Sequence, residues 1–393
     1  MSVLGVRAEV RKVARLLGVK PEQLAFLETQ AAGTIRKVRE AQVELVFRQE
    51  QRLFTRLARW FGWLPSWMLA FFARMLGPLV VARVAGELPA RHAVAVCTRL
   101  PANFLAETAM NLDPRRARDL VRRLPTPLIE EAALELARRG DRMTVGRFVD
   151  YVSEDTLHQV VATLDDASLL GAAFYLESRT HLDHIIAMLP ETRLRRILAL
   201  AGGSRSHAIS VLAILTEGSH TLRRHLGDLM AEEPDAVLLS LMRAAHEEGL
   251  WAELLPVLHS LSPEALCEVV NLPILEEPAV LQSIGDAADA QDLWAIVLPL
   301  IEMMSENIRA SVAHSMTRHP RDAIARMVQS ALVGEHWEPL LDVVSRMPVA
   351  KQDEFVAILE GLGAVDPELR DRIAGRAAAY GFGGRFTPRA VAA

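Results

Sequence analysis

A tryptophan that recurs at a fixed interval is the feature of this sequence that most constrains its fold. Trp251, Trp294 and Trp337 lie 43 residues apart, and each is followed by a similar apolar segment. A proline precedes each tryptophan by 16 or 17 residues (Pro234, Pro278 and Pro320). Markers at constant spacing are typical of a chain in which two or three helices form each repeat. Residues 201–373 are therefore predicted to form helical hairpins with a 43-residue period.

A finer repeat occupies residues 86–200. Leucine recurs every twelve residues from Leu88 onward, and the first four leucines open corners that contain proline (Pro89, Pro101, Pro114 and Pro125). Proline in a helix interior loses a hydrogen bond and clashes, but it suits the first helical turn. Each corner therefore ends one short helix and starts the next, with Asp113, Thr126 and Ser153 as expected caps.

Together, the two repeats predict an all-α fold. We expect an α-solenoid, a right-handed superhelix in which short-helix repeats are followed by 43-residue helical hairpins. The 43-residue period is similar to that of HEAT or armadillo repeats.

Two motifs in the finer repeat carry a family resemblance: Leu100-Pro-Ala-Asn-Phe-Leu-Ala-Glu107 and Leu112-Asp-Pro-x-x-Ala-x-x-Leu-Val-x-x-Leu-Pro125. This pattern resembles the cytoplasmic N-terminal domain of MgtE-type magnesium transporters, over about residues 86–200. The resemblance implies a superhelix of short helices and a magnesium-sensitive regulatory role through acidic surface residues, although no individual metal ligand can be matched. Nothing in the chain is similar to the CBS pair or the pore helices of that family, so transport is not implied.

Charge is distributed unevenly along the 393 residues. The net charge is −5, but residues 1–84 hold 14 lysines and arginines against 6 acidic residues, so the acidic excess lies in the remainder. From Gln51 to Gly86 there are five arginines and no acid. This basic N-terminal part predicts contact either with an anionic partner or with the chain's own acidic face.

Residues 1–60 are predicted to form a basic helical region. A short helix over 3–18 ends at Gly18, and Pro21 begins a second helix. Because residues 22–60 contain no proline and only one glycine, they predict one long helix. Its apolar stripe either docks on the solenoid or joins two chains in a homodimer.

Residues 61–85 are predicted to be an aromatic cap or a membrane-proximal segment. Three tryptophans and three phenylalanines lie within 13 residues, preceded by three arginines (Trp60, Phe61, Trp63, Trp67, Phe71, Phe72, Arg52, Arg56 and Arg59). The uncharged run is 14 residues long, whereas a bilayer span needs about 20. Three roles stay open: a cap on the first repeat, an in-plane anchor over residues 52–81 on an anionic membrane, or a groove for a protein partner.

Candidate chemistry is sparse. The chain has no nucleophile elbow, phosphate-binding loop or dinucleotide-binding motif, so we expect neither enzyme activity nor a cofactor. His181 and His184 would need a third ligand to hold a metal, and a solvated helix start explains them more simply. The possible further donors are His158, His207, His220 and His225. Two cysteines, Cys97 and Cys267, are expected to fill the core, and residues 374–393 to form a flexible tail.

These observations favour a non-enzymatic helical-repeat scaffold or adaptor in the cytoplasm, attached peripherally to the membrane if residues 52–81 bind lipid. Its partner would be a protein segment in the solenoid groove. Nucleic acid is not favoured, because acids match the paired arginines nearby. The alternative is a magnesium-sensing regulatory protein related to the MgtE cytoplasmic domain, with magnesium as its one ligand.

Overall fold

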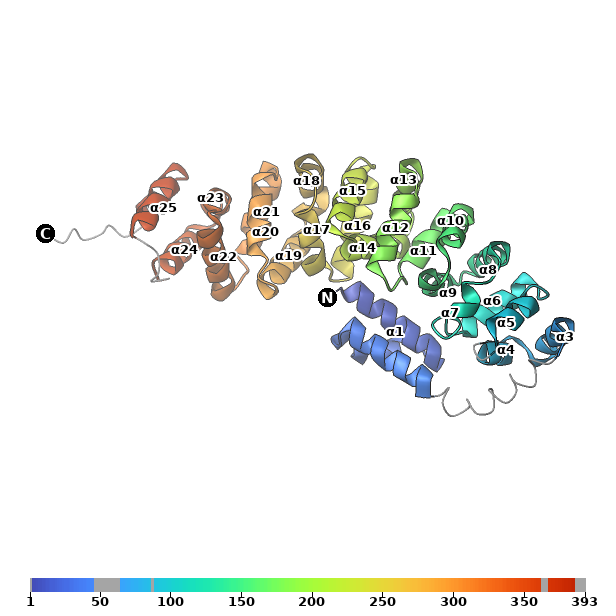
Figure 1. Cartoon of the computed structure of the whole chain (residues 1–393). Coiled ribbons are helices and arrows are strands. Elements are labelled where there is room, and N and C mark those ends of the chain that lie inside the picture. The colour runs from blue at the N-terminus through green and yellow to red at the C-terminus, as the bar shows by residue number, and fades with distance from the viewer. Residues whose placement is uncertain (1, 46–63, 86–87, 362–366, 386–393) are drawn as a thin grey trace. The chain divides into compact units, whose positions relative to one another are not determined.

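The computed structural model describes residues 2–45, 64–85, 88–361 and 367–385. Every regular element in these ranges is a helix, which confirms the predicted all-α fold (Figure 1). The chain divides into two compact units: unit 1 holds Met1–Leu200 with Glu217–Ser219, and unit 2 holds Ala201–Thr216 with His220–Ala393. Among the described residues, no helix has the length and apolar character needed to cross a membrane.

Unit 1 begins with three helical segments and continues as a ladder of short helices. The N-terminal segments are α1 (Val3–Leu17), η1 (Pro21–Thr29) and a helix over 32–45. The ladder contains α3 (Ser66–Leu76), α4 (Pro78–Ala85), α5 (Ala90–Cys97), α6 (Ala102–Asn111), α7 (Arg118–Val121), α8 (Thr126–Arg138), α9 (Arg142–Phe148), η2 (Val149–Tyr151), α10 (Glu154–Thr163), α11 (Asp166–Ala173), α12 (Arg179–Met188) and α13 (Glu191–Ala199).

Most ladder helices pack on the next helix but one. One row runs from α4 through α6 and α8 to α10, while α3 packs on α5 and α5 on α7. The same alternation joins α9 to α11 and α11 to α13. Neighbouring repeats therefore bury each other's apolar faces, as expected of a short-helix solenoid.

The prolines start these helices largely as predicted. Pro89, Pro101 and Pro125 occupy the N-cap positions of α5, α6 and α8. Pro114 differs, because the residues after it form turns and α7 begins only at Arg118.

The predicted caps are confirmed in one case and wrong in another. Ser153 Oγ accepts a hydrogen bond from the N–H of Thr156 at 3.3 Å, which caps α10. Asp113 Oδ1 accepts from the N–H of Arg115 at 3.1 Å within the turn before α7. Thr126 caps nothing: because Pro125 holds the N-cap position, the Thr126 hydroxyl instead bonds to that of Thr156.

The single long helix predicted for residues 22–60 is wrong in its first part. The chain forms the 3-10 helix η1, becomes extended at Gln30 and starts a new helix at residue 32. This break returns the chain onto α1, so that Leu24, Leu27 and Ile35 all reach one small apolar core. Its α1 members are Val6, Val10 and Val13.

The start of the predicted stripe therefore packs on α1 rather than on the solenoid, and its later residues are exposed. Val38 is 51% exposed and Leu45 is 61% exposed. Residues 46–60 of the predicted helix lie outside the described residues. The homodimer through residues 22–60 stays a prediction.

Unit 2 consists of three-helix repeats rather than the predicted hairpins. The unit begins with η3 (Leu200–Gly202), α14 (Arg205–Glu217) and α15 (His220–Ala231). The first repeat consists of α16 (Asp235–Glu247), α17 (Trp251–Leu258) and α18 (Pro263–Val270), and the second of α19 (Pro278–Ala290), α20 (Trp294–Glu302) and α21 (Glu306–Met316). The third repeat consists of α22 (Arg321–Gly334), α23 (Trp337–Ser345) and α24 (Val349–Gly361). The short 3-10 helix η4 (Pro273–Glu276) follows α18. A 43-residue period holds three helices because the second helix of each repeat is only 8 or 9 residues long.

The recurring tryptophans begin the middle helix of each repeat and are buried. Trp251 and Trp294 are 2% exposed, and Trp337 is 3% exposed. The middle helices α17 and α20 pack on the first helix of the following repeat, α19 and α22. Each indole therefore fills the same core position in successive repeats.

Part of the predicted tail is structured. Residues 374–385 belong to α25 (Pro367–Ala379), the following turn and the 3-10 helix η5 (Gly383–Arg385). Phe382 is 2% exposed, and its ring meets that of Phe355 edge to face at 6.4 Å between centroids. Burial of this ring fixes the segment on α24. Residues 386–393 lie outside the described residues.

The core of unit 1 contains an apolar pocket of about 130 Å³. Residues of α4 to α10 line it, among them Cys97 and Ala109. Burial raises the pKa of Cys97 to about 11, so the thiol stays protonated and fills the core as predicted. Cys267 is exposed on α18, so its predicted core role is wrong.

Candidate functional site

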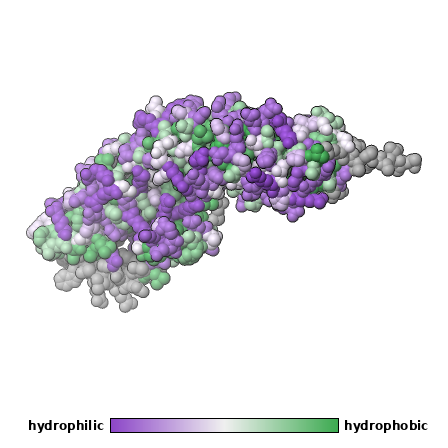
Figure 2. Space-filling view, turned by 180° about the vertical axis from the view of Figure 1, so that it is seen from behind, coloured by the Kyte–Doolittle hydropathy of each residue, from purple (hydrophilic) through white to green (hydrophobic). Residues whose placement is uncertain are grey.

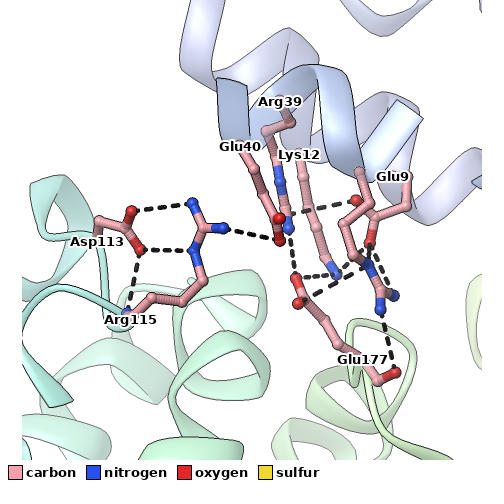
Figure 3. Close-up of polar contacts among 8 residues, drawn as sticks. Glu9, Lys12, Arg39, Glu40, Asp113, Arg115 and Glu177 are labelled. Carbon is pink, nitrogen blue, oxygen red and sulfur yellow. Dashed lines mark hydrogen bonds and ion pairs between the residues drawn. The ribbon is translucent and has the colours of Figure 1, made fainter. Parts of the chain in front are cut away.

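The most strongly charged interior of unit 1 lies where the N-terminal helices meet the ladder (Figure 3). Glu9 and Lys12 come from α1, Arg39 comes from the helix over 32–45, and Glu177 lies between α11 and α12. Lys12 Nζ is 2.9 Å from Glu9 Oε1 and 3.1 Å from Glu177 Oε1. Arg39 donates from Nη2 to Glu177 Oε1 at 2.7 Å.

This network is almost closed to solvent. The side chains of Glu9 and Lys12 are each 2% exposed, that of Arg39 is 11% exposed and that of Glu177 is 15% exposed. Burial alone would raise the pKa of Glu177, but ion pairing with Lys12, Arg39 and Arg36 outweighs it and lowers the pKa to about 2. Glu177 is therefore ionised at neutral pH, and removing either sign of charge would leave an unpaired buried ion.

Two further ion pairs flank the network. Arg15 on α1 binds Asp141 through two hydrogen bonds, of 2.5 and 2.6 Å. Burial raises the pKa of Asp141, but its bonds to Arg15 and Thr144 outweigh burial, so the pKa is lowered overall. On the other side, Arg115 lies 2.9 Å from Glu40. A bidentate arginine–carboxylate pair fixes geometry as well as charge.

The arrangement attaches the N-terminal helices to the acidic face of the ladder. This confirms, for Lys12, Arg15 and Arg39, the interpretation that the basic N-terminal part contacts the chain's own acids. Each carboxylate in the network faces a cation of the chain itself, so the network supports structure rather than general acid–base chemistry.

The predicted aromatic site is only partly described. Trp67, Phe71 and Phe72 lie on α3 and are 62%, 60% and 37% exposed. The other predicted residues (Arg52, Arg56, Arg59, Trp60, Phe61 and Trp63) lie outside the described residues. The inner side of α3 does cover the first repeat, because Leu69, Ala70 and Ala73 pack on α5. The three described rings lie outside that core.

Three apolar residues that we did not single out from the sequence extend this exposed surface. Met75 is 71% exposed, Leu76 is 47% exposed and Leu79 is 52% exposed. In Figure 2, apolar side chains (green) gather at the left of the view, in the part of unit 1 that contains α3 and α4. The spacing of Trp67, Phe71 and Met75, four residues apart, is the signal that could have identified one face of the helix. We call these six residues the α3–α4 apolar surface.

The comparisons with known proteins add no assignment. No protein-family model matches the chain, and no curated protein matches it. The resemblance of residues 86–200 to the MgtE N-terminal domain stays a prediction, as does the similarity of unit 2 to HEAT or armadillo repeats.

Proposed function

We propose that the chain is a non-enzymatic helical-repeat adaptor that attaches to the anionic cytoplasmic face of a membrane through the α3–α4 apolar surface. The exposure of this surface is the observation that carries the proposal. Its repeats would remain free of lipid and bind a protein segment, since stacked repeats offer extended binding surfaces.

The apolar contribution is sufficient for reversible binding. An aromatic side chain buries roughly 150–250 Å², and burial contributes roughly 25 cal/mol per Å². Transfer of the exposed parts of Trp67 and Phe71 into the interface would therefore contribute on the order of 2–4 kcal/mol each. Met75, Leu76 and Leu79 add aliphatic area beside the rings.

Charge favours a lipid surface over an arbitrary protein. Arg74 and Arg83 lie in α3 and α4, and the sequence from Gln51 to Gly86 contains no acid. Each basic residue near an anionic bilayer contributes about 1 kcal/mol, and salt weakens this attraction. Aromatic rings beside arginines are typical of helices that lie in the membrane interface.

Co-sedimentation with vesicles tests the proposal. The full chain should pellet with phosphatidylserine-containing vesicles at low salt, and less in high salt or with neutral vesicles. The double variant Trp67→Ser, Phe71→Ser should stay in the supernatant with unchanged helical content. Val333→Ser is the matched control, because Val333 is 84% exposed but lies in unit 2. If the unaltered chain does not pellet, or if the control loses binding equally, the proposal is wrong.

Magnesium sensing, which the MgtE resemblance implies, is less well supported. The acids of the unit 1 network already face cations of the chain, so Mg²⁺ would have to displace Lys12, Arg15 or Arg39. If it did, millimolar Mg²⁺ would change the melting temperature and the scattering profile. If the melting temperature and the scattering profile are the same with and without Mg²⁺, the chain does not sense magnesium.

A further inference from the structure

A different group of side chains in unit 1 combines two imidazoles with one carboxylate. Glu154 and His158 lie on α10, and His184 lies on α12. One ligand atom from each of the three residues lies within 4.8 Å of the other two. The group is accessible from solvent, because Glu154 and His158 are exposed and His184 is half-buried.

Local structure explains why the three residues converge. Glu154 and His158 are four residues apart, so they share one face of α10. Ser178 fixes the start of α12 by accepting a hydrogen bond from the N–H of His181 at 3.4 Å. His184, one turn later, reaches α10, where its ring stands edge-on to that of His158, with 6.3 Å between centroids and 82° between planes.

The neighbouring histidine is used differently. His181 Nδ1 lies 2.8 Å from Asp150 Oδ1, so it does not join the group. The sequence paired His181 with His184, but in the structure His181 contacts Asp150, and His158 is the imidazole that lies beside His184.

The distances suit a small transition-metal ion. His184 Nε2 is 3.3 Å from Glu154 Oε1. Two ligand atoms that each lie about 2.0–2.1 Å from a tetrahedral zinc ion are about 3.3 Å apart. Small side-chain rotations would bring His158 to the same separation. Imidazole nitrogen favours zinc-type ions over magnesium, which prefers oxygen ligands.

We propose that Glu154, His158 and His184 form a zinc-type site that links α10 to α12 and leaves one coordination position to water. The proposal is independent of membrane attachment. It also differs from the expectation drawn from the sequence, in which His184 belongs to a solvated helix start. A bound ion would hold together two helices that are separated by α11.

Zinc titration by calorimetry, with the metal-free full chain, tests the site. We expect one zinc ion per chain and a rise in melting temperature with zinc concentration. Replacing zinc with cobalt should give the visible absorption of a tetrahedral centre, and zinc should remove that absorption.

Single variants locate the ligands. His158→Ala, His184→Ala and Glu154→Gln should each weaken zinc binding at least tenfold, while circular dichroism without zinc stays unchanged. His220→Ala is the control, because His220 is an exposed histidine that does not belong to the group. The proposal is overturned if the unaltered chain binds no zinc, or if zinc affinity is the same in the three ligand variants as in the unaltered chain.

Discussion

Replacing Glu177 with glutamine should weaken the attachment of the N-terminal helices to the ladder. Folding lowers the pKa of Glu177 from 4.5 to about 2. One pKa unit corresponds to about 1.4 kcal/mol, so the ionised side chain contributes about 3 kcal/mol to holding α1 in place. Because the pKa is lowered on folding, this contribution is complete above pH 4.5 and is lost as the pH falls toward about 2.

Hydrogen exchange in α1 measures this effect. At neutral pH, Glu177→Gln should lower the opening free energy of α1 by about 3 kcal/mol, which accelerates exchange of its amides by roughly a hundredfold. In the unaltered chain, the same acceleration should appear as the pH falls from about 4.5 to about 2, after correction for the intrinsic rate.

The matched control is a carboxylate in an exposed ion pair. Glu191 is 58% exposed and lies 2.8 Å from Arg195 on the same helix. Glu191→Gln should change stability by less than about 0.5 kcal/mol. If α1 exchanges equally slowly in both variants, the buried network contributes no net stability, and apolar contacts alone hold the N-terminal helices.

Three further predictions concern packing. Gly285→Ala should lower the free energy of unfolding, measured in urea, by about 1–3 kcal/mol, because the alanine Cβ would lie 2.4 Å from His319 Nε2. In Gly375→Ala the new Cβ meets no atom within 4 Å, so the free energy of unfolding should rise by up to about 1 kcal/mol. Equal changes in the two glycine variants would contradict the packing described for Gly285. Trp294→Ala should cost about 3–5 kcal/mol and lower the calorimetric transition of unit 2, and an unchanged transition would refute burial of the indole. Benzene should raise the melting temperature of the unaltered chain but not of Ala109→Leu, which fills the unit 1 pocket; no rise in either would mean that the pocket is closed in solution.

Local features of the fold were predictable because they depend on neighbouring residues. Proline suits the start of a helix, so Pro89, Pro101 and Pro125 marked helix starts, whereas Pro256 and Pro299 lie inside α17 and α20. The tryptophan period located the repeats of unit 2 but not their number of helices, because the lengths of the connecting turns were not encoded in the period. The break at Gln30 was missed because nothing in its local sequence excludes a helix.

Contacts between distant residues could not be predicted from the sequence. The basic N-terminal part indicated an acidic counterpart, yet many acids were available, and only the folded ladder brings Glu177 to Lys12. The His158–His184 contact was likewise one of several pairings that the sequence left open. Met75, Leu76 and Leu79 were missed because the sequence does not show which apolar residues of this segment pack on a neighbouring helix and which stay exposed.

The network between Lys12 and Glu177 also sets an order of events during folding. These side chains are 165 residues apart, whereas each ladder helix contacts partners close to it in sequence. On the ribosome, the basic helices emerge long before the carboxylates that neutralise them. The ladder can assemble progressively from nearby helices, and attachment of α1 must follow as a late step that closes a long loop. In that interval Arg15 lacks Asp141, and Lys12 and Arg39 have only Glu9 on α1 as a shared partner, so the nascent chain is more basic and more adhesive toward anionic surfaces than the finished protein.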